Sequence, residues 1–588
     1  MADTPSSNVD DGRTDLLDPP MTTAAANELR RLGQDFFNLQ NTVDPLSATM
    51  LGITGYDHLL PDFSRAASER SAAAFAKIED AVRSLNLDEL DEAQRTNALV
   101  LERLAWGARA DIESDIWETN AGSEGYATPA SMIFMCVPAA GVAHEAAAKN
   151  YLTRLSGISE VFDAITERYQ CALRDGRYST RAGIERLLEQ LRGHVETPIE
   201  VDLLANPPWG DVNVSTISQQ SREVVETRVR PAISRLINVL EGPLLNHARD
   251  DEHVGLCHLP GGARAYALAV RRHTTTELSP EEIHSVGLDH LDRLAEEWAE
   301  LGLRTLGISD VGEITRRLRS DPSLRCRDAS EIIFTVTAAL NRAEFHLSRW
   351  FPPFDIAPCI VEEINPVEAK SAALAHYRPP AGDGSRPGAH CVLTLDPASR
   401  FLYEYEALAF HESVPGHHLQ IATAQAMTSL PEYRRYLDVQ VCAFVEGWGL
   451  YSERLADEMG LYSSDIARLG MLSFDALRAC RLVVDTGMHA LGWSRQRAID
   501  FMWSHTATTM SNVTNEIDRY ITWPGQALAY MTGRLEIERL REWAAQSLGA
   551  HFDIREFHEL VLSDGAVPLG ILARNVTRWV EGIQEREK

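Results

Sequence analysis

SPEEIHSVGLDHLDRLAEEWAEL, residues 279–301, indicates the class of fold most clearly. It starts with three signals of a helix N-terminus: Ser279 as the capping residue, Pro280 at the first helical position, and Glu282 three residues after the cap. Apolar side chains then recur at helical spacing, at Ile283, Val286, Leu291, Leu294, Trp298 and Leu301. The stretch therefore predicts a long amphipathic helix.

The same apolar spacing recurs outward from this stretch along most of the chain. It predicts further long helices over residues 464–491 and 494–510. The exception is HYRPPAGDGSRPGAHCVLTL, residues 376–395, where proline and glycine block helix formation and predict a loop with two short strands. The end of this piece either presents an edge strand to an extended ligand or forms a purely structural hairpin. The predicted fold is mainly α, with a small β element near residues 376–395.

Length and composition are those of a folded globular protein, with 588 residues of which 44% are hydrophobic and 24% charged. Residues 1–22 are rich in Asp, Ser, Thr and Pro, so we expect this segment to be disordered. We expect residues 23–588 to form one large helical body, with two lobes around a deep cleft.

The charge balance restricts the partners of the protein. Lys and Arg number 56 against 85 Asp and Glu, which gives a net charge of −29 and argues against nucleic acid or an anionic membrane as a partner. The eight cysteines form no CxxC pair and are expected to be reduced thiols. The first residues lack the basic and apolar regions of a signal peptide, and no run of 18 apolar residues occurs, so a cytoplasmic location is predicted.

The stretch ALAFHESVPGHHLQ, residues 407–420, carries the most distinctive chemistry. A helical zinc hydrolase places two histidines four residues apart, with a glutamate after the first, but here Pro415 stands four residues after His411. On a straight helix neither His417 nor His418 could share a metal ion with His411. Because proline breaks the helix and Gly416 tolerates unusual backbone angles, the SVPG segment could bulge and return His417 to His411. Alternatively, the break simply ends a helix and the histidines cap or pack there.

A second stretch, AFVEGWGLYSE at residues 443–453, places a carboxylate in apolar surroundings. Glu446 follows His417 by 29 residues and needs a partner there, which is either a metal ion or an arginine. Two histidines and a glutamate, with the fourth position left to water, are typical of a catalytic zinc site. The two stretches together favour the metal-ligand role for Glu446.

Four motifs, HESVPGHH, FVEGWGLYSE, VDTGMHALGW and PGQALAY, resemble those of the bacterial family called domain of unknown function 885. The likeness extends from near residue 45 to near residue 543. More distantly, the chain resembles the mostly helical glutamate-zincin peptidases, which include the thermostable carboxypeptidase, thimet oligopeptidase and angiotensin-converting enzyme groups. This resemblance implies a peptidase-like helical domain, residues 23–588, with a deep cleft.

The peptidase resemblance also implies roles for individual residues. His411 matches the first ligand of one Zn²⁺ ion, and Glu412 matches the general base that accepts a proton from water. His417 matches the second ligand and Glu446 the third. Two extra residues precede the glycine–histidine pair, so the choice between His417 and His418 stays open.

Further candidates follow from the C-terminal part of the chain and from the loop of residues 376–395. In the related peptidases a tyrosine or histidine near the C-terminus stabilises the oxyanion, and Tyr520 and Tyr530 are the candidates here. Arg534 lies four residues after Tyr530, shares its helical face, and could bind a substrate carboxylate. By position alone, Tyr377 and Arg386 are predicted to line the substrate channel.

Arg481, Asp485 and His489 recur at every fourth position of an otherwise apolar helix and should form one polar stripe. The stripe either holds Glu446 or a ligand histidine in place or is a self-contained buried ion pair.

The motifs and the resemblance together predict a zinc-dependent hydrolase of short peptides, and the resemblance to the peptidases implies an exopeptidase of carboxypeptidase type. Two alternatives stay open: a hydrolase of a non-peptide amide, and a helical binding or scaffold protein whose altered histidine motif holds no metal. Oligomeric state, substrate and physiological metal are left open.

Overall fold

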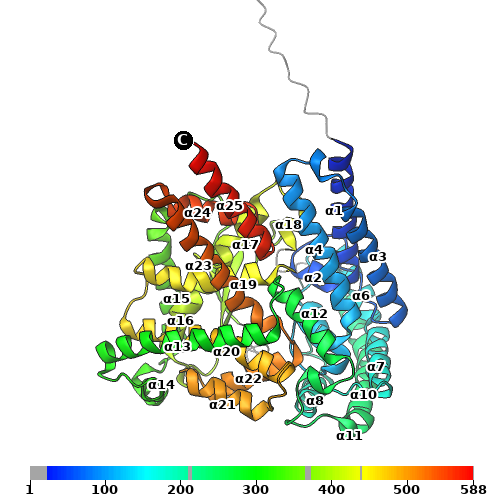
Figure 1. The fold of residues 1–588 in the computed structure, drawn as a ribbon. Coiled ribbons are helices and arrows are strands. Elements are labelled where there is room, and N and C mark those ends of the chain that lie inside the picture. The colour runs from blue at the N-terminus through cyan, green and yellow to red at the C-terminus, as the bar shows by residue number, and fades with distance from the viewer. Residues whose placement is uncertain (1–22, 210–214, 365–372, 438–439, 587–588) are drawn as a thin grey trace, which may run out of the picture.

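The computed structural model describes residues 23–209, 215–364, 373–437 and 440–586, so the expectation for residues 1–22 lies outside the described residues. The chain is mainly helical, as predicted (Figure 1). Its first part contains α1 (Ala24–Val43), α2 (Pro45–Met50), α3 (Arg65–Arg83), α4 (Glu92–Ser114), α5 (Pro129–Cys136), α6 (Glu145–Ser156), α7 (Ile158–Arg174), α8 (Arg181–Glu196), α9 (Ser215–Val224), α10 (Arg230–Val239) and α11 (Leu245–His247).

The remaining helices carry the predicted site. The middle of the chain contains α12 (Gly262–Thr274), α13 (Pro280–Leu306), α14 (Val311–Ser320), α15 (Ala329–His346), α16 (Tyr405–Glu412), α17 (His417–Ala426), α18 (Glu432–Tyr436) and α19 (Cys442–Glu458). The last part contains α20 (Asp465–His489), α21 (Arg495–His505), α22 (Met510–Thr522), α23 (Ala529–Leu548), α24 (Ile554–Ser563) and α25 (Leu569–Arg586). In Figure 1 the helices α1, α3 and α4 lie on one side of the molecule, and α23 and α24 lie on the other.

The predicted helices are confirmed except at one boundary. Helix α13 begins with the predicted capping box, in which Ser279 and Glu282 exchange side-chain-to-backbone hydrogen bonds. The single helix predicted over residues 494–510 is wrong, because α21 ends at His505 and α22 starts at Met510. The side chain of Thr509 accepts a hydrogen bond from the backbone N–H of Asn512 and so caps a new helix, which propensity alone did not reveal.

A small sheet accompanies the helices, with strands β1 (Cys359–Glu363), β2 (Ala375–Arg378) and β3 (Gly388–Val392) in the order β1-β3-β2. The predicted strand pair is confirmed, since β2 and β3 are antiparallel, whereas the parallel strand β1 was not predicted. The edge-strand expectation for the end of this segment is wrong. Cys391 and Val392 lie in the central strand, so their backbone groups already face a neighbour on each side.

The hydrophobic residues of the described ranges form three large buried clusters. One joins α1, α3 and α4 to α15–α19 and α23–α25, a second surrounds α20 and α13, and a third lies among α5–α10. Helix α20 is enclosed, since every side chain from Leu469 to His489 is buried. Four charged residues of this run are therefore inside the protein and need polar partners: Asp475, Arg478, Arg481 and Asp485.

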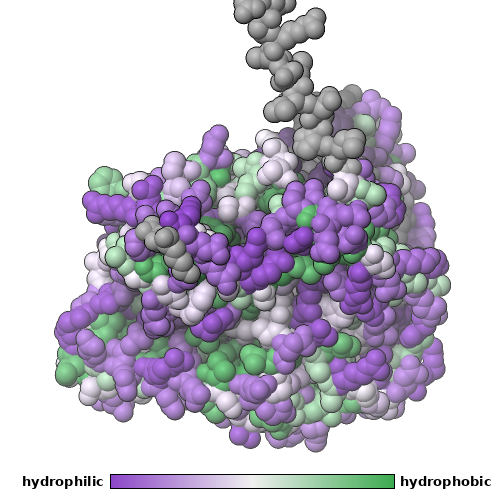
Figure 2. Space-filling view, turned by 45° about the horizontal axis from the view of Figure 1, so that its top comes forward, coloured by the Kyte–Doolittle hydropathy of each residue, from purple (hydrophilic) through white to green (hydrophobic). Residues whose placement is uncertain are grey.

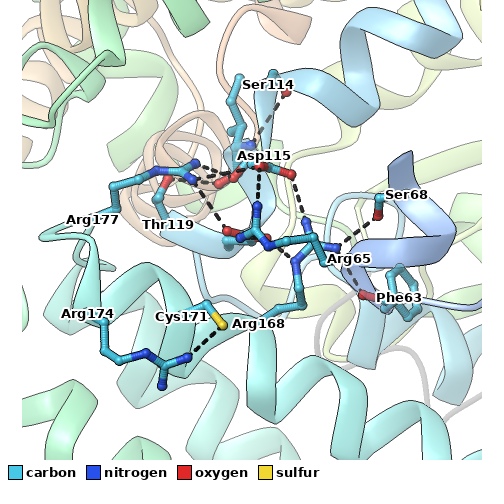
Figure 3. Close-up of polar contacts among 12 residues, drawn as sticks. Phe63, Arg65, Ser68, Ser114, Asp115, Thr119, Arg168, Cys171, Arg174 and Arg177 are labelled. Carbon is cyan, nitrogen blue, oxygen red and sulfur yellow. Dashed lines mark hydrogen bonds and ion pairs between the residues drawn. The ribbon is translucent and has the colours of Figure 1, made fainter. Parts of the chain in front are cut away.

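The N-terminal part of the chain has its own buried ion-pair network (Figure 3). Arg168 of α7 donates to Asp115 at 2.7 Å and to the Phe63 carbonyl and the Ser68 hydroxyl at 2.9 Å each, and it also pairs with Glu118. These contacts hold α7 against the C-terminal end of α4, the loop before α3 and the first turn of α3, which indicates a structural role for the network.

No helix of the described residues is long and apolar enough to cross a membrane. On the face shown in Figure 2, hydrophilic side chains predominate and hydrophobic ones gather in small groups between them.

Helices α19 and α23 approach at backbone distance through Gly447 and Gly533. A Cβ atom at Gly533 would lie 1.7 Å from the Ala443 carbonyl oxygen of α19. Gly533→Ala is therefore expected to lower the free energy of unfolding by about 1–3 kcal/mol through overpacking. Gly582→Ala in α25, where a Cβ meets nothing within 4 Å, should be neutral or stabilising. Urea unfolding of both variants checks this, and equal midpoints would contradict it.

Candidate metal centre

The predicted histidine motif spans the end of α16, a four-residue turn and the start of α17. Helix α16 ends at Glu412 and α17 begins at His417. The backbone of Gly416 lies against the last turn of α16, where a Cβ would be 1.9 Å from the His411 carbonyl oxygen. Only glycine permits this approach, and the fold-back brings the His411 and His417 rings to a centroid distance of 4.6 Å.

Glu446 joins these two rings from α19. Its Oε2 atom lies 3.8 Å from His411 Nε2 and 3.5 Å from His417 Nε2. The three ligand atoms lie within 4.8 Å of one another, and in the described part of the chain no other group of His, Cys, Asp and Glu does so. Ligand atoms around tetrahedral zinc are about 3.3 Å apart, given its bond lengths, so the three side chains would have to move closer together to hold the ion.

The electrostatics of the group favour a positive charge at its centre. Burial lowers the pKa of His411, but the carboxylates of Glu446 and Glu453 outweigh burial and raise it to about 9. Burial likewise opposes ionisation of Glu446, yet the two histidines hold the pKa of its carboxyl well below the usual range. These features suit a cation bound between the three side chains.

The group is buried but open on the side of α19. The side chains of His411 and His417 are 4% and 9% exposed to solvent, whereas the side chain of Glu446 is 20% exposed. Glu412, the predicted general base, follows His411 directly and is buried at the end of α16. A surface hollow of about 460 Å³, formed by residues of α8, α21 and α22, contains none of these four residues.

Glu453 belongs to the site and was not predicted. Its Oε1 atom lies 2.9 Å from His411 Nδ1, on the ring side opposite Glu446, and Arg478 NH2 holds that oxygen at 3.2 Å. Gly449 lets the His411 ring pack on α19, where a Cβ would be 2.7 Å from the ring. The available signal was the second glutamate of FVEGWGLYSE, which stands seven residues, two helical turns, after Glu446.

Glu453→Gln is expected to weaken zinc affinity by about 10–100-fold without abolishing binding, because a carboxylate behind a ligand imidazole fixes its orientation and raises its basicity. Competition titration with a chromogenic chelator measures the change. An unchanged affinity would remove Glu453 from the site.

His418 is turned toward the sheet and away from the ligand group. Its Nδ1 atom lies 3.0 Å from the Tyr377 hydroxyl of β2. Burial lowers the pKa of His418 to about 4, so the ring is neutral at pH 7. The geometry therefore groups His417 with His411, and it places Tyr377 beside His418.

The two predicted oxyanion tyrosines have different surroundings. The Tyr520 hydroxyl accepts a hydrogen bond from Arg481 Nε at 2.7 Å and donates to Glu516, so it is fully engaged. The Tyr530 hydroxyl accepts only a long hydrogen bond, 3.4 Å, from Gln526. Burial is the main cause of the raised pKa of Tyr530, and the Glu446 carboxylate adds to it. Of the two, Tyr530 therefore has the less engaged hydroxyl, and its pKa is affected by Glu446.

Asp485 and His489 form part of the predicted stripe but contact neither Glu446 nor a ligand histidine. Asp485 accepts hydrogen bonds from the Tyr266 hydroxyl at 2.6 Å and from the Gly525 N–H at 3.1 Å. His489 Nε2 donates to the Tyr520 carbonyl at 3.0 Å. Asp485 and His489 thus hold the end of α22 and the turn before α23, which separates Tyr520 from Tyr530.

The predicted substrate-binding arginines are held elsewhere. Arg534 NH1 lies 2.6 Å from Asp475, and its Nε donates to Glu538 at 2.8 Å. Arg386 donates to the carbonyls of Pro379 and Met50 and ties its loop to α2. Substrate binding by Arg534 would have to break a buried ion pair, which is costly.

The chain matches, over residues 45–576, the family described as "Bacterial protein of unknown function (DUF885)". It belongs to this family. Two solved structures resemble this DUF885 chain. "The putative lipoprotein from Colwellia psychrerythraea" is 28% identical, with a TM-score of 0.88, covering 95% of this chain and 100% of its own. "A putative lipoprotein of unknown function from Shewanella oneidensis" is 18% identical, with a TM-score of 0.71, covering 93% and 99%, and shows the fold alone. No curated protein matches.

Proposed function

We propose that this DUF885 chain is a zinc-dependent hydrolase of short peptides, an exopeptidase of carboxypeptidase type. The observation that carries the proposal is the convergence of His411, His417 and Glu446, within 4.8 Å, from separate helices. A zinc ion with two imidazoles and one carboxylate lowers the pKa of water and polarises a carbonyl group. The distant resemblance to glutamate-zincin peptidases supports peptides as the substrate and a cleft as the place of binding.

The residues around the group have complementary roles in this proposal. Glu412 accepts the proton of the attacking water and returns it to the leaving amine. Tyr530, a neutral phenol at pH 7, donates its hydroxyl hydrogen to the developing oxyanion. Glu453 orients His411 from behind, and Arg478 orients Glu453.

The net charge and the solved relatives bear on where the protein acts and on what it binds. The net charge of −29 disfavours nucleic acid and anionic membrane surfaces as partners. Both solved relatives are described as putative lipoproteins, which favours peptides outside the cytoplasm as substrates over the cytoplasmic setting predicted from the N-terminal residues.

Incubation of the purified protein with a library of short peptides, read by mass spectrometry, tests the function. We expect single residues to be lost from the carboxyl end, loss of cleavage on chelation, and recovery with added zinc. Bound zinc without cleavage of any peptide would point to the non-peptide amide hydrolase. A protein that holds no metal and cleaves nothing would point to a binding or scaffold role.

A further inference from the structure

We propose that Arg481 forms an anion subsite that receives the free carboxylate of the substrate. This inference rests on the proposed function and deepens it, because it names the substrate class as peptides and N-acyl amino acids with an unmodified carboxyl end. In this proposal the residue that binds the substrate carboxylate is Arg481 of α20, and not Arg534 as the sequence predicted.

The first observation is an unsatisfied hydrogen-bond donor inside the protein. Arg481 is 7% exposed, its Nε donates to the Tyr520 hydroxyl at 2.7 Å, and its NH2 donates to Glu516 at 2.8 Å. Its NH1 is buried and has no partner. A buried donor on a cation is costly to leave unpaired, so a group that arrives from outside the chain would be bound strongly there.

The second observation is a local excess of positive charge. Arg519 lies 3.1 Å from the same carboxylate, Glu516, so two buried guanidinium groups contact one anion. The other hydrogen-bond partners of the two arginines, Tyr520 and Gln526, are neutral. Asp485 of the α20 stripe accepts hydrogen bonds from Tyr266 and Gly525 and interacts with Arg519 only through its charge. A carboxylate from a ligand would give the unpartnered NH1 of Arg481 a charged acceptor of its own.

The third observation is the position of this cluster relative to the metal group. The Arg481 guanidinium carbon lies 4.1 Å from the centroid of the Tyr530 ring. Gln526 Nε2 lies 3.4 Å from the Tyr530 hydroxyl and 3.5 Å from Cys442 Sγ, one helical turn before Glu446. Tyr530 thus stands between Arg481 and α19. The metal group, Tyr530 and Arg481 thus follow one another in the order that a carboxypeptidase substrate requires. Its scissile carbonyl would lie at the metal group and its terminal carboxylate at Arg481.

Another buried arginine with free donors does not compete for this role. Arg478 also has unpartnered nitrogen atoms, but its guanidinium pairs with Glu453, the carboxylate behind His411. Its charge is therefore already used to hold a ligand histidine.

Isothermal calorimetry with N-acetyl-dialanine and its C-terminal amide tests the subsite, because the two probes differ only in the carboxylate. All proteins carry Glu412→Gln so that the probe is not consumed. The parent should bind the acid about tenfold or more tightly than the amide, the advantage expected of a charge-assisted hydrogen bond. Adding Arg481→Gln should remove this preference, whereas the exposed Arg497→Gln on α21 should keep it.

A second variant covers the case in which Arg481→Gln unfolds, as judged by circular dichroism. Arg481→Lys keeps the charge but loses the planar fork, and it should bind the acid with a preference smaller than that of the parent. Equal binding of acid and amide by the parent, or an undiminished preference in a folded Arg481 variant, would overturn the subsite. Zinc content is measured on the same preparations. A protein without zinc that still prefers the acid would refute the proposed hydrolase and leave the subsite standing.

Discussion

Glu412→Gln is expected to lower kcat for peptide hydrolysis by about 10²–10⁴-fold while the zinc content stays stoichiometric. Glutamine keeps the size and the burial of the side chain, but it cannot accept the proton of the attacking water. Glu412 is not one of the three residues whose ligand atoms converge, so the metal should remain. Steady-state kinetics and metal analysis on one preparation measure both effects.

The matched control for this variant is Glu296→Gln, which makes the same chemical change on the exposed face of α13 and should leave kcat unchanged. Turnover retained by Glu412→Gln would remove Glu412 from the role of base. Loss of zinc together with activity would instead show that Glu412 helps to hold the ion.

His417→Ala should lose zinc under conditions in which His418→Ala keeps it. Removal of one of three protein ligands is expected to lower zinc affinity by more than the roughly 10–100-fold expected when a residue behind a ligand, such as Glu453, is changed. The His418 ring lies against Tyr377 and is not part of the ligand group, so its removal should change zinc affinity little. Zinc titration of the two neighbouring variants compares them directly.

Both variants delete an imidazole from consecutive positions of α17, so a general loss of folding would affect them alike and would be visible in thermal unfolding. If His418→Ala loses the metal and His417→Ala keeps it, the ligand assignment is reversed. If both keep it, the histidine pair is not the metal site.

The sequence predicted the features that depend on neighbouring residues. The start of α13 is encoded in Ser279, Pro280 and Glu282, and the structure has that helix as predicted. The helix break at Pro415 and Gly416 could also be predicted, because each of these residues restricts or frees its own backbone.

Features that depend on tertiary partners could not be predicted in the same way. The four-residue spacing of Tyr530 and Arg534 gives a shared helical face but does not reveal Asp475, which pairs with Arg534 from α20. Glu453 was missed for the same reason, since its partner His411 stands 42 residues earlier. Strand β1 was not predicted, because its five residues form a strand only through pairing with β3.

An anomalous difference map recorded at the zinc absorption edge, from crystals of the protein purified without added metal, tests the central claim most directly. The account predicts one strong peak at about 2.0–2.2 Å from His411 Nε2, His417 Nε2 and a Glu446 oxygen. The absence of a peak between these three side chains, or a peak held by other residues, would contradict it.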